Sequence, residues 1–443
     1  MKIVPRALRV ACSAIFIAIL SVPIIGKASV AGLPAWDTVP AASPGTNSSL
    51  RGIADLGGGA VWAVGTTSTA PLAQRWNGKA FVRVPIAGLA NRKNVLEGVD
   101  GTAPNDVWAV GHADSIDFVG SRSLIFRWNG SNWTRLPSPN SGDSESSNDL
   151  FAVAAVSARD AWAVGQFVDI STFRALTLHW DGRSWRSVTN PCGSGLTGVT
   201  ALASNNVWAV GGRTICHWNG QRWSAQAAPT IPGRSIDLKD VDGVPGALWA
   251  VGLEHSSCGE GVCSGGVILR RSNNSWIREA SGYQLSGVTA LAANNAWAVG
   301  TWAYGPLLLH RGATSWEPVP SPDVGGIGSL AGVSAAGPKS LWAAGKRLVP
   351  GANGLLEDRT LALHAPSDRS GAVAGNSAGH TAISWFGPET GSTESDQFGR
   401  FLVGGLTAGR YDFIASLQGC TPARRQVNVP AGTTIELSLI PRC

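Results

Sequence analysis

The sequence predicts an all-β protein: a seven-bladed β-propeller closed by its N-terminal strand, followed by a small C-terminal antiparallel β-sandwich. Three observations predict this fold. A tryptophan-centred pentapeptide recurs seven times, hairpin signals keep a constant spacing within each repeat, and the last repeat lacks a strand that the start of the mature chain supplies. Repeats of about 45 residues with four short strands are typical of propeller blades.

The repeated pentapeptide is a hydrophobic residue followed by Trp-Ala-Val-Gly in six copies, and the seventh copy is the variant Leu-Trp-Ala-Ala-Gly. A leucine precedes its tryptophan by 12 residues in six repeats and by 11 in the fifth, with turn-formers such as Pro104-Asn105-Asp106 between them. The spacing predicts two strands joined by a tight turn. The seven tryptophans lie 41 to 54 residues apart, at Trp62, Trp108, Trp162, Trp208, Trp249, Trp297 and Trp342.

A third and a fourth strand complete each repeat. In the first four repeats the third strand ends in Trp-Asn-Gly or Trp-Asp-Gly, as at Trp76-Asn77-Gly78, and the fourth opens with an aromatic residue such as Phe81. Repeats five and six keep only the later aromatic, Trp276 and Trp316. Asn-Gly and Asp-Gly favour the positive φ angles of a hairpin turn. Four strands per repeat, joined up and down, therefore make one blade.

Closure of the ring is predicted from the two ends of the repeat array. The seventh repeat has a third strand at 361–364 but no aromatic fourth strand, because Pro366-Ser367-Asp368 follows. The stretch from Ala35 to Pro40 matches the fourth-strand pattern of residues 315–320. The N-terminal strand is therefore expected to complete the last blade and to leave no open sheet edge.

The repeated aromatic residues are expected to be packing residues. Two large rings at matching places in successive blades would fill the wedge between neighbouring sheets. The third-strand histidines His179, His217, His310 and His364 share one position in their repeats, so packing explains them as well. Trp302 and Tyr304 lie outside the pattern, in a connecting loop.

The connections fall on two faces of the ring. Those between first and second strands, and between third and fourth, have nearly constant length. The other connections vary, and we call the face that carries them the variable face. Recognition usually sits on variable loops of a fixed scaffold, with plain solvated loops as the alternative. The candidate ligand-binding residues there are Asp114, Asp117, Asp169, Glu254, His255, Trp302, Tyr304, Glu357 and Asp358.

Residues 1–31 are predicted to be a secretory signal peptide. Lys2, Arg6 and Arg9 precede an apolar run at 10–25, and the small residues Ala28 and Ala31 mark the cleavage region. An uncleaved membrane anchor is the alternative. Without this segment the chain carries 31 basic and 29 acidic residues, so neither a nucleic-acid-binding face nor a membrane span is expected in the mature protein.

Six cysteines remain in the mature chain, which favours disulfides in an exported protein. Their spacing predicts the bridges Cys192 to Cys216, Cys258 to Cys263 and Cys420 to Cys443. A metal site built from Cys258, Cys263 and His255 is the alternative for the second pair, although it lacks an identifiable fourth ligand. No metal and no cofactor are expected.

The propeller spans residues 32–366 and a second module residues 369–443. The module carries Asp396-Gln397-Phe398-Gly399-Arg400-Phe401 and Ala408-Gly409-Arg410-Tyr411, with which it resembles the carboxypeptidase regulatory-like, or transthyretin-like, domain. This resemblance implies a non-catalytic sandwich. The Trp-Ala-Val-Gly repeats are similar to those of secreted bacterial propellers in the kelch and galactose-oxidase-like class, which implies a seven-bladed ring.

The sequence contains no His-Glu-x-x-His metal-binding motif and no phosphate loop. The predicted function is an exported, monomeric, non-catalytic binding or scaffold protein, secreted or held in the cell envelope. Its variable face would recognise a glycan or an extracellular or envelope protein. The alternative is a glycan-active hydrolase or lyase with its site at the centre of that face, which requires paired carboxylates.

Overall fold

The computed structural model describes residues 36–443 apart from 116, 118–119, 259–260, 313, 338–339, 352–353, 367–371, 388–389, 397–398, 404–405, 407–408 and 430–433. The predicted signal peptide lies outside the described residues. The described chain is built of β-strands, and it contains no helix with the length and apolar composition needed to cross a membrane.

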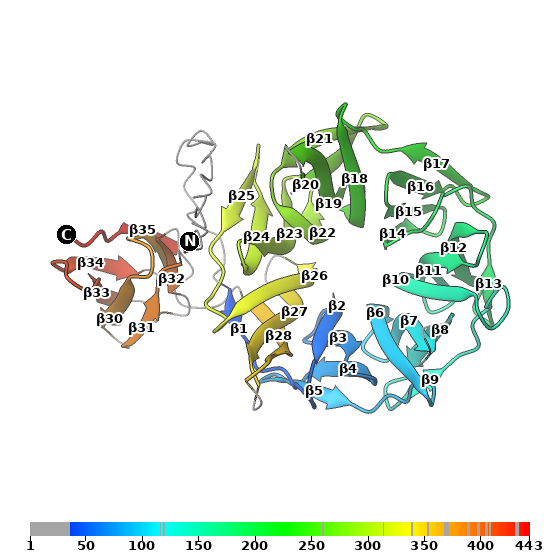
Figure 1. Ribbon diagram of the computed structural model, residues 1–443, viewed down its shortest axis with the longest axis horizontal. Coiled ribbons are helices and arrows are strands. Elements are labelled where there is room, and N and C mark those ends of the chain that lie inside the picture. Colours follow the sequence, from blue (N-terminus) through cyan, green and yellow to red (C-terminus); the bar gives the residue numbers. More distant parts are fainter. Residues whose placement is uncertain are drawn as a thin grey trace, which may run out of the picture.

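Seven four-stranded antiparallel sheets stand around a common axis, as the repeat predicts (Figure 1). From the axis outward, blades one to three are β2 (Ser49–Asp55), β3 (Val61–Thr66), β4 (Pro71–Trp76), β5 (Phe81–Val84); β6 (Arg92–Ala103), β7 (Asp106–Ser115), β8 (Ser121–Trp128), β9 (Trp133–Arg135); β10 (Ser147–Ser157), β11 (Asp160–Val168), β12 (Phe173–Trp180), β13 (Trp185–Ser187).

Blades four to seven follow in the same order. They are β14 (Gly198–Ala203), β15 (Asn206–Gly211), β16 (Thr214–Trp218), β17 (Trp223–Ala227); β18 (Arg234–Val244), β19 (Ala247–Cys258), β20 (Gly261–Ser272), β21 (Ser275–Ser281); β22 (Gln284–Ala292), β23 (Asn295–Trp302), β24 (Gly305–Arg311), β25 (Trp316–Val319); β26 (Ile327–Gly337), β27 (Ser340–Pro350), β28 (Leu356–Pro366), β1 (Asp37–Thr38).

The predicted closure is confirmed. Strand β1 pairs antiparallel with β28, with Asp37 opposite His364 and Thr38 opposite Leu363. The backbone N–H of Val39 continues the pairing by donating to the carbonyl of Ala362. The last blade therefore takes its outer strand from the N-terminal end of the described chain.

The repeat tryptophans pack between blades, as expected. Trp62 of the first blade contacts Trp128 and Trp133 of the second, with ring centroids 4.9 and 5.0 Å away. Trp342 of the seventh blade makes the same kind of contact with Trp76 and Phe81 of the first. Because Trp62 and Trp342 are at most 2% exposed, these rings are core and not a ligand platform.

The third-strand histidines are packing residues as well. His364 stacks on Trp342 with ring centroids 3.7 Å apart, and His217 stacks on Trp208 at 4.1 Å. In the first two blades an arginine takes this place, and Arg127 lies over the ring of Trp108 at 4.7 Å. A flat or cationic group over the inner indole face therefore recurs around the ring.

The C-terminal module is a sandwich of two sheets beside blades six and seven (Figure 1). One sheet runs β32-β29-β35 and the other β31-β30-β33-β34. Strands β29 and β35 run parallel, so the first sheet is mixed and not purely antiparallel. The strands are β29 (Ala372–Asn376), β30 (Ala382–Phe386), β31 (Gly391–Glu394), β32 (Arg400–Val403), β33 (Gly409–Ser416), β34 (Ala423–Val429) and β35 (Thr434–Ser438).

All three predicted disulfides are present. Cys192 pairs with Cys216, Cys258 with Cys263, and Cys420 with Cys443. The alternative metal site at Cys258 and Cys263 is therefore wrong, because both sulfur atoms are used in the bridge. The first disulfide ties the link between blades three and four to strand β16, and the second closes the end of the β19–β20 hairpin on the variable face.

Candidate functional site

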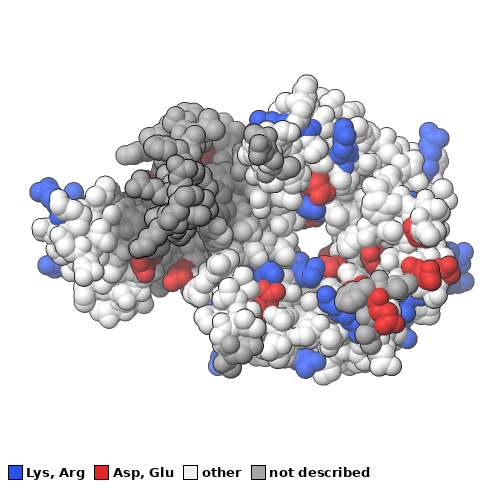
Figure 2. Space-filling view, in the orientation of Figure 1, with Lys and Arg blue, Asp and Glu red and all other residues white. Residues whose placement is uncertain are grey.

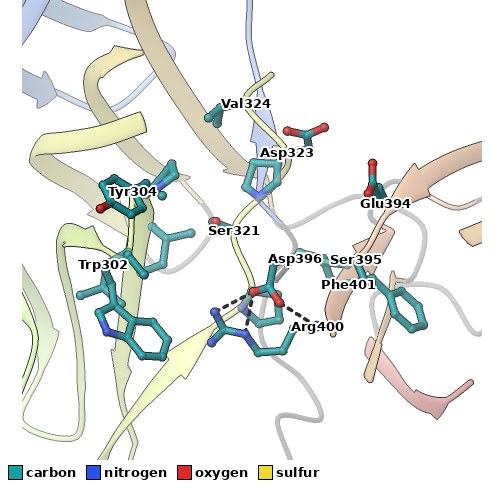
Figure 3. Close-up of a pocket in the computed structure, with 18 of the residues that line it drawn as sticks. Trp302, Tyr304, Ser321, Asp323, Val324, Glu394, Ser395, Asp396, Arg400 and Phe401 are labelled. Carbon is teal, nitrogen blue, oxygen red and sulfur yellow. Dashed lines mark hydrogen bonds and ion pairs between the residues drawn. The ribbon is translucent and has the colours of Figure 1, made fainter. Parts of the chain in front are cut away.

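A cleft of about 340 Å³ lies where the variable face of blades six and seven meets the C-terminal sandwich (Figure 3). The propeller side is formed by the β23–β24 turn and the link 318–327 between blades. The sandwich side is formed by His380, residues 393–396 and residues 400–402. Both modules are therefore needed to make this cleft.

Tyr304 and Trp302 form the aromatic wall of the cleft. The register pairs Trp302 with Gly305, so Ala303 and Tyr304 alone make the turn between β23 and β24. Their φ angles are 46° and 75°, the left-handed pair that this hairpin turn requires and that glycine or asparagine usually supplies. A tyrosine in this conformation costs about 1 kcal/mol or more, and such strain is concentrated at functional sites.

The floor of the cleft holds a fixed arginine. The Arg400 guanidinium bonds Asp396 through Nε at 2.8 Å and Nη2 at 2.7 Å, and the Arg400 backbone N–H donates to the same carboxylate at 2.8 Å. The guanidinium also lies 5.2 Å from the centroid of the Trp302 ring. Because the two-point pair fixes its plane, Arg400 presents a preorganised cation beside the aromatic wall (Figure 3).

Two further carboxylates line the cleft from opposite sides. Asp323 comes from the propeller link and accepts the backbone N–H of Gly325 at 2.8 Å. Glu394 ends β31 of the sandwich, and its side chain is 57% exposed with the His380 imidazole 3.4 Å away. The cleft thus combines aromatic faces, hydroxyls and both signs of charge, the composition of a polar-ligand site.

Of the nine residues predicted as ligand-binding, the structure brings Trp302 and Tyr304 together in this cleft. Asp114 lies at the end of β7, near His112 and Asp149. The remaining predicted residues lie in other connections of the variable face or beneath it.

Glu254 is enclosed in blade five. Its side chain is 4% exposed, and Oε2 accepts 2.7 Å bonds from both Arg234 and Arg278. His255, next along β19, exchanges a 2.9 Å hydrogen bond between Nδ1 and the hydroxyl of Ser264. Glu254 is therefore placed to join strands of one sheet, not to face a ligand.

The other predicted acids belong to loop structure. Asp169 caps its own turn by accepting the backbone N–H groups of Ser171 and Thr172, and these bonds hold the pKa of its carboxyl below the ordinary value. Glu357 pairs with Arg359 at 2.7 Å, and Asp358 pairs with Lys346 at 3.0 Å. Asp117 is exposed in a turn.

A second hollow of about 360 Å³ follows the axis of the ring and is strongly polar (Figure 2). In six inner strands a β-bulge follows the repeat leucine, and the bulged residue lines the hollow. These residues are Arg51, Glu97, Phe151, Lys239, Ser286 and Ala331. The Arg51 guanidinium and the Glu97 carboxylate form a 3.0 Å ion pair across blades one and two.

Deeper acids in this hollow fasten neighbouring blades. Asp240 accepts the backbone N–H of Val288 at 3.0 Å, and Asp100 accepts that of Ala155 at 2.8 Å. Burial raises the pKa of Asp240 to about 7, with a further rise from the nearby charge of Asp242. Burial likewise raises the pKa of Asp100 to about 6. These carboxyls act as acceptors between blades.

Sequence reasoning missed the sandwich side of the cleft. Asp396 and Arg400 belong to the motif that carries the family resemblance, but that motif predicts the fold of the module and does not indicate a binding site. Asp323 and Glu394 carry no sequence signal, because only the packing of the two modules brings them together. His112 and Asp149 were missed because they lie on different blades.

No protein-family model matches the chain, and no curated protein matches it in sequence. Among solved structures, YCF48 bound to D1 peptide is 14% identical with a TM-score of 0.50, over 76% of this chain and 98% of that one. A catalytically inactive virginiamycin B lyase from Staphylococcus aureus with quinupristin is 14% identical with a TM-score of 0.49, over 74% and 98%. At this identity the likeness shows a β-propeller fold alone.

Proposed function

We propose that this chain is an exported, non-catalytic binding protein that holds a carbohydrate in the cleft between the propeller and its C-terminal sandwich. One observation carries the proposal: Tyr304 is 74% exposed at the cleft, in a turn whose backbone is unfavourable for tyrosine, next to Trp302 at 36%. Every other tryptophan of the described ring is buried or half-buried. An exposed aromatic pair in a hollow marks a recognition surface.

The chemistry of the cleft suits a sugar. Aromatic faces stack on the apolar C–H faces of pyranose rings, while carboxylates and a guanidinium exchange hydrogen bonds with hydroxyls. Within this cleft, Tyr304 and Trp302 supply the aromatic faces and Arg400 supplies the guanidinium. A cleft volume of about 340 Å³ is the size of a short oligosaccharide segment.

A non-catalytic role is supported by the interactions in which the carboxylates are engaged. Asp396 is held by Arg400, Asp323 accepts a backbone N–H of its own loop, and Glu97 in the axial hollow is paired with Arg51. Glu394, mostly exposed and 3.4 Å from His380, is then the remaining carboxylate among the described residues that line the cleft, a single group and not a pair. A glycosidase needs one carboxyl free to donate a proton and another free to attack or to activate water. The hydrolase or lyase alternative predicts that bound sugars are cut.

Export is supported by the three disulfides, which persist in oxidising compartments. The predicted signal peptide of residues 1–31 supplies the route. A monomer is supported by the closed ring, because the outer strand of the last blade is β1 of the same chain and is not supplied by a second chain. We also propose that the sandwich is a carboxypeptidase regulatory-like module and that the ring belongs to the kelch and galactose-oxidase-like class.

An envelope or extracellular protein is the second candidate ligand, favoured by apolar loop tips on the variable face. Ile170 and Phe173 are fully and 55% exposed in blade three, and Leu355 and Leu356 are 68% and 58% exposed in blade seven. Large exposed aliphatic side chains at loop ends suit a protein surface better than a sugar.

A glycan array probed with the mature protein tests the proposal. We expect binding to a limited set of glycans, loss of binding in Tyr304→Ala, and retention in Phe173→Ala, an exposed aromatic on the same face of blade three. Equal binding by Tyr304→Ala and the wild type would refute the cleft as the site. Silence across all glycans would favour a protein ligand, and release of shortened sugars would favour the enzyme.

A further inference from the structure

His112, Asp114 and Asp149 meet on the variable face where blade two borders blade three. His112 and Asp114 are two residues apart on β7, so both side chains leave the same face of that strand. Asp149 comes from the inner strand of the next blade, β10. One imidazole nitrogen and one oxygen from each carboxylate lie within 4.8 Å of one another.

From this arrangement we propose that the three residues bind a divalent transition-metal cation of the Zn²⁺ type. One imidazole and two carboxylates are ligands that zinc takes readily, and a fourth position would stay open to water. The imidazole argues against Ca²⁺ and Mg²⁺, which prefer oxygen alone. The site is separate from the cleft at Tyr304 and does not rest on the proposed sugar ligand.

Asp149 is oriented as metal-binding carboxylates usually are. The residue is 9% exposed, its Oδ1 accepts a hydrogen bond from the hydroxyl of Ser121, and its Oδ2 accepts one from Nε2 of Gln166 at 2.9 Å. Ser121 is itself fixed, because its hydroxyl accepts the backbone N–H of Asn148 at 3.0 Å. Each Asp149 oxygen keeps a lone pair for an ion while its neighbours hold the plane of the carboxylate.

His112 directs one ring nitrogen toward Asp114. Its Nδ1 atom is enclosed and finds no hydrogen-bond partner among the described residues, while Nε2 lies 3.5 Å from Oδ1 of Asp114. The ring is held edge-on to Phe151 with centroids 6.3 Å apart. Nε2 is therefore the nitrogen placed to ligate a cation together with Asp114, through the one lone pair that a neutral imidazole offers.

Charged groups of both signs surround the three residues. Glu97 lies close enough for its pKa to respond to both His112 and Asp149, and burial raises that pKa above the ordinary value. Arg51 pairs with Glu97, and Lys93 faces Asp114 across the β6–β7 ladder. Arg92 also lies beside the cluster, because its guanidinium donates to the carbonyl of Ala113 at 3.1 Å. A divalent ion would bind the two aspartates together with the imidazole.

Calorimetric titration of the untagged mature protein with ZnCl₂ tests the proposal. We expect one site and at least tenfold weaker binding in Asp114→Asn. Ser121→Ala removes the hydroxyl that supports Asp149 and accepts the Asn148 N–H, so it should bind tenfold to hundredfold more weakly while keeping all three ligands. The matched control is Asp160→Asn, which alters a His179–Asp160 pair of 2.8 Å on the other face and should bind like the wild type.

Several outcomes would overturn the site. They are no saturable Zn²⁺ binding by the wild type, unchanged affinity in Asp114→Asn, and an equal loss in Asp160→Asn. Calcium chloride at the same concentrations should give at least tenfold weaker binding, and equal affinity would contradict the metal class. Asp114 is 29% exposed, so its variant is expected to fold, and its metal-free thermal midpoint checks this.

Discussion

The indole of Trp36 packs edge-on against the indole of Trp297, with centroids 5.4 Å apart and planes at 67°. In the preceding blade pair Trp316 meets Trp249 in the same way, at 6.4 Å and 86°. Trp36 is thus the fourth-strand aromatic of blade seven, although it lies about 300 residues before the rest of that blade in sequence. The ring closes through a side-chain contact as well as through the β1–β28 pairing.

The closing contact predicts a large stability effect at Trp36. Trp36→Ala should lower the free energy of unfolding by about 3–5 kcal/mol, because the indole is 1% exposed and its loss leaves a cavity between blades. Urea unfolding measures this. Tyr304→Ala, which removes a mostly exposed ring, should change stability by about 0.5 kcal/mol or less. Equal effects of the two variants would contradict closure through Trp36.

The buried Asp240 predicts a pH-dependent stability. Its pKa of about 7 in the fold exceeds the ordinary value of 3.8, so its contribution is full below about pH 4 and is lost as the pH rises to about 7. Relative to Asp240→Asn, whose amide oxygen still accepts from Val288, the wild type should lose about 4 kcal/mol across this window.

Asp100→Asn should show the same trend with a smaller amplitude of about 3 kcal/mol, ending near pH 6, because its pKa is about 6. Denaturant unfolding of the wild type and both variants at several pH values makes the comparison. If the difference in free energy of unfolding between wild type and variant stays constant from pH 4 to 8, these carboxyls are not buried between blades.

Glu254 is predicted to stabilise blade five. Glu254→Gln leaves Arg234 and Arg278 facing each other without their shared carboxylate, so stability should fall by about 3 kcal/mol. Glycan or protein binding, measured on the folded variant, should be unchanged. Lost binding with unchanged stability would instead assign Glu254 to the ligand site.

The two propeller disulfides should contribute differently to the free energy of unfolding. Cys192 to Cys216 closes a separation of 24 residues and Cys258 to Cys263 one of 5. Replacing the first pair by serine should cost about 3 kcal/mol and replacing the second about 2 kcal/mol, because the longer loop restricts the unfolded chain more. Thermal unfolding of the two double variants gives the order, and the reverse order would contradict this explanation.

The fold could be predicted from the sequence because each blade carries the same local sequence signals. The leucine, the pentapeptide and the Asn-Gly turn fix strand order locally, and the unmatched Trp36 stretch identifies the closing strand. The parallel pairing of β29 with β35 could not be predicted, because alternation of apolar residues does not reveal strand direction.

The candidate site was predicted in part. Trp302 and Tyr304 were identified because they break the repeat, and a residue that breaks a packing pattern is free to serve another purpose. Glu254 looked like a loop acid, since the sequence does not show that β19 continues to Cys258 and encloses it. The proximity of Asp149 and His112 could not be predicted from the sequence, because only the packing of adjacent blades brings them together.

Hydrogen–deuterium exchange of the mature protein, with and without the best glycan from the array, tests the central claim most directly. Bound glycan should slow exchange in the β23–β24 turn and in residues 393–402, and it should leave the axial strands unchanged. Protection confined to the axial hollow, around Glu97 and Asp240, would contradict the account and place the ligand at the centre of the ring.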